Sequence, residues 1–138
     1  MRHFVTLGFP LLLATTFIGC GGSNNPPSIP TQPTPVAITE TFPGTLTVNG
    51  AVTHVFTVDR AGTVSAQIKA LSDQAATVGV SLGTFNGVAC AIIISNTAAV
   101  LNTTVTGTAT SSGQFCVWIN DVSKLTARID YSIDVTHY

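Results

Sequence analysis

Catalytic chemistry in this sequence would depend on very few side chains, because only three of its 138 residues are histidines. A hydrolytic triad needs a histidine within hydrogen-bonding reach of a nucleophile and oriented by an acid. His54 lies on the same face of an expected strand as Val52, Phe56 and Val58, which favours a half-buried structural side chain. His137 is the penultimate residue, so we expect it to lie exposed at a frayed chain end. The motifs Gly-x-Ser-x-Gly and His-Glu-x-x-His do not occur, and we predict no catalytic residue.

Carboxylates at the separation that a glycosidase needs are also not apparent. Asp130 and Asp134 share one face of an expected strand, but four residues of strand span roughly 13 Å. The aspartates Asp59, Asp73 and Asp121 each adjoin an expected turn, where the side chain is favoured by hydrogen bonds to nearby backbone. An Asp-x-Asp-x-Asp spacing typical of calcium loops does not occur. The sequence therefore predicts no metal site, no cofactor and no enzymatic activity.

The N-terminal residues have the pattern of a secretory signal. Arg2 precedes an apolar run, Phe4 to Ile18, which as a helix would reach only about 22 Å, short of the roughly 30 Å hydrocarbon core of a bilayer. The run ends in Phe17-Ile18-Gly19-Cys20, which resembles the lipobox of bacterial lipoproteins, with Phe17 where Leu is usual. The resemblance implies that residues 1–19 are removed and that Cys20 is acylated. The alternative is an ordinary signal peptide in which Cys20 is incidental.

Residues 20–37 are expected to form a flexible tether, because prolines recur there without apolar periodicity. The expected partner is a membrane, to which the acyl chains on Cys20 would anchor the protein firmly. The lipoprotein resemblance places the protein in the bacterial cell envelope. In a Gram-negative bacterium it implies the outer membrane, since Gly21 and not Asp follows the cysteine.

Taking Cys20 as the lipid carrier leaves Cys90 and Cys116, an even pair in an oxidising compartment. A disulfide between them is the default interpretation. In the chain-entropy model, closing a loop of about 27 residues stabilises a fold by roughly 3.5 kcal/mol.

Composition sets the fold class and excludes one class of partner. Charged residues make up 8% of the chain and the net charge is −1, which leaves no basic surface for nucleic acid. Threonine and valine are abundant, with 22 and 15 copies, and both favour strands. Short β-rich runs separated by turn signals predict about eight strands in one antiparallel β-sandwich over residues 38–138. The expected strands are Thr45 to Val48, Val52 to Val58, Thr63 to Ala70, Thr77 to Leu82, Val88 to Ser95, Ala98 to Thr106, Gln114 to Asn120 and Thr126 to Thr136.

Two of these runs carry especially clear signals. Asn49-Gly50 separates the first two expected strands and is the strongest short signal for a β-hairpin. In the last strand Ile129, Tyr131, Ile133 and Val135 alternate with polar residues, which predicts one buried face.

The pattern over residues 40 to 138 resembles the bacterial pre-peptidase C-terminal domain. The resemblance is carried by three sets of segments: Gly44-Thr45-Leu46 with His54-Val55-Phe56-Thr57-Val58; Ala61-Gly62-Thr63-Val64 with Val80-Ser81-Leu82; and Ser112 to Val117 with Tyr131 to Val135. It implies a jelly-roll-like β-sandwich with an accessory role, in substrate binding or in assisting a neighbouring domain. This chain departs from the family in that no peptidase domain is attached.

The single tryptophan is the best candidate for contacting a ligand. Phe115, Val117 and Ile119 match the family's core positions, which turns Trp118 outward. A hairpin of the last two strands that paired Ile119 with Ile129 would place Trp118 opposite Asp130 and near Arg128. Such a surface suits stacking on a sugar ring or gripping an extended peptide.

Two other interpretations of Trp118 remain open. Arg128 could cover the indole in a cation-π contact that only supports the sheet. A register slip of one residue could instead place Trp118 in the core and expose Phe115.

The sequence thus predicts a lipid-anchored binding or accessory module of the bacterial envelope that recognises a polysaccharide or a peptide. The alternative is a structural envelope protein or assembly partner with no small ligand. An apolar patch or an open sheet edge would favour that alternative.

Overall fold

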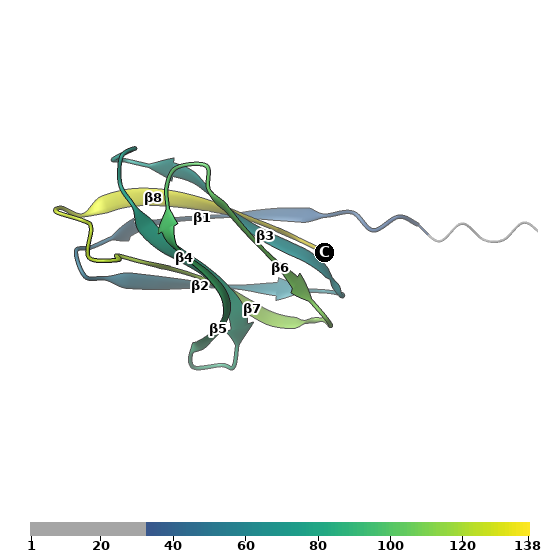
Figure 1. Ribbon diagram of the computed structural model, residues 1–138. Helices are drawn as coiled ribbons and strands as arrows, with labels where there is room; N and C mark the ends of the chain where they lie inside the picture. Colours follow the sequence, from purple (N-terminus) through teal and green to yellow (C-terminus); the bar gives the residue numbers. More distant parts are fainter. Residues whose placement is uncertain (1–32) are drawn as a thin grey trace, which may run out of the picture. The chain divides into compact units, whose positions relative to one another are not determined.

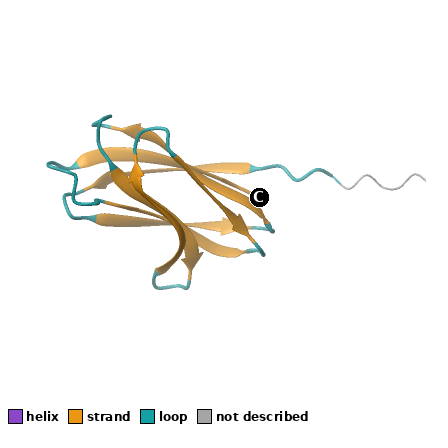
Figure 2. Cartoon of the chain, in the orientation of Figure 1, coloured by secondary structure: helices purple, strands orange, loops and turns teal. Residues whose placement is uncertain are grey.

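The computed structural model describes residues 33–138, so the predicted signal peptide, Cys20 and most of the predicted tether lie outside the described residues. Within this part the regular structure consists of strands joined by loops and turns (Figure 2). The strands are β1 Ile38–Leu46, β2 Ala51–Val58, β3 Gly62–Leu71, β4 Val78–Phe85, β5 Cys90–Ala99, β6 Thr104–Ala109, β7 Gly113–Asn120 and β8 Ile129–His137. No helix long and apolar enough to cross a membrane occurs among the described residues.

The strands form two four-stranded antiparallel sheets that pack as a sandwich (Figure 1). Sheet A has the order β1-β8-β3-β6 and sheet B the order β2-β7-β4-β5. The pairing is nested, because β1 pairs with β8, β2 with β7, β3 with β6 and β4 with β5. This is the arrangement of a jelly roll, and it confirms the predicted all-β sandwich.

Alternation along each strand builds the core between the sheets. In β8 the side chains of Ile129, Tyr131, Ile133 and Val135 are all buried, as predicted. Val117 and Ile119 of β7 are fully buried, which leaves Trp118 on the outer face. A strand buried on one face places every second residue inside, and in these strands the inward positions hold aliphatic and aromatic side chains.

The first strand begins earlier than predicted, at Ile38, and pairs with β8 along all nine of its residues. Pro43 lies within this strand. A proline cannot donate to a strand ladder, but β1 is at the edge of sheet A and needs a partner on one side only.

The prediction of a hairpin at Asn49-Gly50 is wrong. The turn forms, with Asn49 in the left-handed region at φ 56° and the Gly50 amide donating to the Thr47 carbonyl at 2.9 Å. It joins β1 in sheet A to β2 in sheet B. A local turn signal specifies that the chain reverses, but the partner of each strand is chosen by pairing with segments far along the chain.

The predicted hairpin of the last two strands is also wrong, because β7 lies in sheet B and β8 in sheet A. His137 is a further correction. It is 3% exposed, since β8 stays paired with β1 to its last residue, and its Nε2 lies 2.8 Å from Glu40 Oε1.

Candidate binding surface

Trp118 occupies the outer face of sheet B. It pairs with Thr53 of β2 on one side and with Ser81 of β4 on the other, and it is partly exposed. Its side chain borders a shallow depression of about 380 Å³, at the lower end of the roughly 300–1,000 Å³ typical of ligand sites. The residues that line this Trp118 depression are Thr53, Val88, Ala89, Cys90, Ile92 and Trp118.

A disulfide fixes one side of the Trp118 depression. Cys90 and Cys116 are bonded, with their Cα atoms 5.8 Å apart, which confirms the predicted pair. The bond joins the start of β5 to β7, the strand that carries Trp118. Because it ties two strands that are not neighbours in sheet B, it restrains the depression more than strand pairing alone would.

The depression is also free of charge. The sequence contains no Asp, Glu, Lys, Arg or His between Asp73 and Asp121, a stretch that includes β4 to β7. An indole face beside aliphatic and hydroxyl groups can contact the apolar face of a sugar ring or the side chains of a polypeptide. Its lining residues offer no charged side chain for an ion pair.

Arg128 and Asp130 are not brought to Trp118. The Asp130 carboxylate lies on the outer face of sheet A, where it accepts a hydrogen bond from Thr45 Oγ1 at 2.7 Å. Arg128 precedes β8 and borders a different, polar depression together with Asp73 and Lys124. The predicted three-residue surface required β7 and β8 to pair, and they belong to different sheets.

The two described histidines lie between the sheets. His54 Nε2 and Tyr131 Oη share a hydrogen bond at 2.7 Å, and the imidazole stacks on Phe42 with ring centroids 5.1 Å apart. Burial lowers the pKa of His54 below its usual 6.5 and raises the pKa of Tyr131 to about 12. Both groups are therefore neutral near pH 7, which fits the structural role predicted for His54.

Asp121 clips two loops together, in accordance with the prediction for loop aspartates. One carboxylate oxygen accepts from the Asn49 amide at 2.8 Å, and the other accepts from the amides of Lys124 and Leu125 at 2.8 and 3.1 Å. The bond from Asn49 is the main reason why the pKa of Asp121 is lowered.

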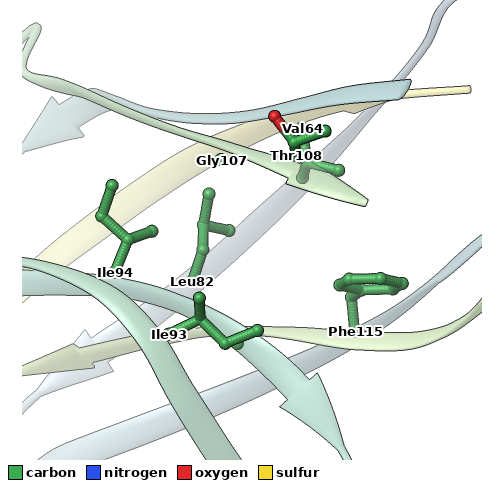
Figure 3. Close-up of a pocket in the computed structure, with 8 residues that line it drawn as sticks. Val64, Leu82, Ile93, Ile94, Gly107, Thr108 and Phe115 are labelled. Atoms are coloured by element: carbon green, nitrogen blue, oxygen red, sulfur yellow. The ribbon is translucent and has the colours of Figure 1, made fainter. Parts of the chain in front are cut away.

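The edge strand β5 exposes three consecutive isoleucines that the sequence analysis did not single out. Ile92, Ile93 and Ile94 are 46%, 70% and 38% exposed. Ile93 and Ile94 border a narrow apolar slot that opens between the two sheets, across from Val64 and beside Leu82 and Phe115 (Figure 3). The uncharged stretch from residue 74 to 120 is the signal that could have drawn attention to this strand.

Comparison with known proteins shows the fold. A crystal structure of a Yersinia pseudotuberculosis-derived mitogen matches with a TM-score of 0.57 at 19% identity, covering 75% of this chain and 88% of the mitogen. Aeromonas hydrophila PliG, a periplasmic lysozyme inhibitor of g-type lysozyme, matches with a TM-score of 0.53 at 13% identity, covering 72% of this chain and 85% of PliG.

Both share the β-sandwich. No family model and no curated protein matches the chain. The resemblance to the pre-peptidase C-terminal domain therefore rests on alternating apolar positions and turn glycines alone.

Proposed function

We propose that this protein is a lipid-anchored binding module of the bacterial cell envelope that holds its ligand at the Trp118 depression. Acylated Cys20 would attach it to the membrane after removal of residues 1–19, and residues 20–37 would separate the sandwich from the lipid. The observation that carries the proposal is a partly exposed tryptophan in an uncharged surface depression stiffened by a disulfide.

Two further observations support an extracytoplasmic binding role. Disulfides persist in oxidising compartments and are rare in the cytosol, and this chain has one joining β5 to β7. PliG, which shares the fold, is a periplasmic inhibitor of an enzyme. The same architecture is thus suited to contacting another macromolecule outside the cytoplasm, and the proposed ligand is a polysaccharide or a polypeptide.

The binding proposal is tested by titrating the Cys20→Ser chain with peptidoglycan fragments, envelope polysaccharides, unfolded peptides and lysozyme while following Trp118 emission. We expect a saturable quench or blue shift with one of these probes. Val88→Ser should weaken binding, because Val88 is 90% exposed and lines the depression. Val100→Ser is the matched control, exposed at 43% and outside the depression. An emission spectrum unchanged by every probe would overturn the proposal.

The anchoring proposal has its own test. When the full gene is expressed in a Gram-negative host, the wild-type chain should fractionate with membranes, and Cys20→Ser should release it. Metabolic labelling with a fatty acid should mark only the wild-type chain. Equal fractionation of both chains without label would leave an ordinary signal peptide as the explanation.

A second candidate function is that of an envelope assembly partner with no small ligand. The observation that favours it is the exposed isoleucine edge of β5, since an open apolar edge is able to pair with another protein. Red-shifted Trp118 emission that no probe changes, together with stable association of β5 with a different envelope protein, would select this candidate.

A further inference from the structure

The β5 edge, defined here as Ile92, Ile93 and Ile94 with the free side of their strand, exposes more large apolar side chains than any other edge of the sandwich. β5 ends sheet B, so its outward backbone amides and carbonyls have no strand partner. Proteins usually blunt such an edge with charged residues, proline or bulges. β5 contains no Asp, Glu, Lys, Arg or Pro from Cys90 to Ala99, and of these devices it has only the register shifts of its pairing with β4.

The other three edges differ from β5. β1 carries Glu40 and Pro43. β6 buries its apolar residues Val105 and Ala109 and exposes threonines. β2 exposes one larger apolar side chain, Val55, at 38%. Only at β5, among the described strands, do three consecutive large apolar residues reach solvent.

A bulge accounts for this exposure. The register with β4 shifts so that Ile92 pairs with Gly83 and Ile94 with Leu82, which leaves Ile93 without a partner. The extra residue bends the strand. As a result Ile92 borders the Trp118 depression on the outer face, whereas Ile93 and Ile94 border the slot between the sheets.

We propose that the β5 edge docks on the β5 edge of a second copy of this chain, antiparallel, about a two-fold axis near Ile93. Near such an axis each residue faces its own copy or a close neighbour, so any charge of one sign would repel itself. A strand that lacks charge, as β5 does, avoids this cost. The pairing places Ile92 opposite Ile94 of the second copy and hides the apolar side chains from water.

The bulge limits the shared ladder to a few residues, so the dimer is expected to be reversible and dependent on concentration. Pairing would extend sheet B from four strands to eight and put both Trp118 depressions on one continuous face. Self-association itself does not depend on the ligand proposed for that depression. A failed Trp118 titration would therefore not affect the proposed dimer. A chain that stays monomeric would likewise not affect the proposed binding at the Trp118 depression.

Sedimentation velocity of the Cys20→Ser chain over a wide concentration range tests the proposal. We expect the mass to rise from monomer to dimer as concentration increases. Ile93→Lys should weaken association more than tenfold, because two ammonium groups would meet at the axis. Val48→Lys, which adds the same charge at a 43% exposed position in the β1–β2 turn, is the matched control and should associate as wild type does.

A charge-swap experiment identifies the surface. Ile93→Lys and Ile93→Glu should each be monomeric, and an equimolar mixture should form a heterodimer. Far-UV circular dichroism and Trp118 emission should match wild type in both variants, because Ile93 is 70% exposed and its replacement leaves the core intact. A wild-type chain that stays monomeric at all concentrations, or variants that still dimerise alone, would overturn the proposal.

Discussion

At the scale of single residues, the polar groups of this protein act mainly as structural fasteners. His54 is held by Tyr131 and Phe42 between the sheets, and Asp121 is held by three backbone amides at a loop junction. Both shifted pKa values make the folded state sensitive to acid.

The pKa of His54 should lie below 6.5 in the folded chain, because burial disfavours the imidazolium. Between that lowered value and 6.5 the unfolded chain binds more protons than the folded chain. The contribution of His54 to the free energy of unfolding should therefore be fully present above pH 6.5. It should be lost as the pH falls from 6.5 through the lowered pKa. An NMR titration of the His54 Cε1 proton gives the folded pKa, and a midpoint at or above 6.5 would contradict the burial argument.

Asp121→Asn should lower the melting temperature, since one of the two accepting oxygens becomes an amide donor beside backbone N–H groups. The lowered pKa of Asp121 means that its contribution is present above about pH 3.8 and is lost as the pH falls through the folded value. Asp134→Asn is the control, because that carboxylate accepts from Thr41 Oγ1 on the exposed face. Equal melting temperatures for the two variants would show that the clip is not stabilising.

At the scale of elements, β4 is the strand that joins β5 to the rest of sheet B. It lies between β7 and β5, and Gly83 occupies the position where β5 bulges. A Cβ there would collide with the backbone carbonyl of Ala91. The absence of a side chain thus permits the close pairing that displays the isoleucines.

Gly83→Ala should destabilise the fold by about 1–3 kcal/mol, the usual cost of overpacking when the neighbour is backbone. Gly107→Ala is the matched control, because its Cβ would lie 3.6 Å from the nearest side-chain atom, an ordinary contact. That substitution should be neutral or stabilise by about 0.4–1 kcal/mol. Urea unfolding of both variants checks the difference, and similar stabilities would mean that β5 moves freely relative to β4.

The disulfide is the other determinant at this scale. Removing it with Cys90→Ala and Cys116→Ala together should lower the free energy of unfolding by about 3.5 kcal/mol through the entropy of the loop it closes. Chemical unfolding with and without a thiol reductant provides an independent comparison. A loss below 1 kcal/mol would indicate that the reduced unfolded chain already keeps this loop compact, or that strain in the folded state offsets the entropy gain.

At the scale of the whole molecule, the nested pairing makes the sandwich one cooperative unit. Every strand pair joins the first half of the strands, β1 to β4, to the second half, β5 to β8. Both sheets also bury their inner faces in one shared core. Neither half of the strands can satisfy its pairing without the other.

Unfolding curves from Trp118 emission and from far-UV circular dichroism should therefore coincide, as expected of a two-state domain. Refolding should take milliseconds to seconds, because contacts distant in sequence must form first. Stopped-flow fluorescence measures this rate. Two separated transitions would show that one sheet survives without its partner.

Much of this protein could be read from local pattern. β-rich runs between turn signals predicted an eight-stranded sandwich, and alternation predicted the buried face of β8, because the side-chain period of a strand is a local property. Two of the expected runs were misplaced: Thr45 to Val48 shares only two residues with β1, and Ala98 to Thr106 spans the end of β5, the turn after it and the start of β6. The outward side of Trp118 followed from the core positions beside it. Cysteine count predicted the disulfide, since an even pair in an oxidising compartment has few other uses.

Only the tertiary structure decided which strands share a sheet. Pairing of β1 with β8 buried His137 and carried Asp130 to the opposite sheet from Trp118. The same topology left β5 at an edge with its isoleucines in solvent. Neither outcome is encoded in local periodicity, which specifies which face of a strand is buried. The neighbours of each strand are selected by the long-range pairing that closes one core around all eight strands.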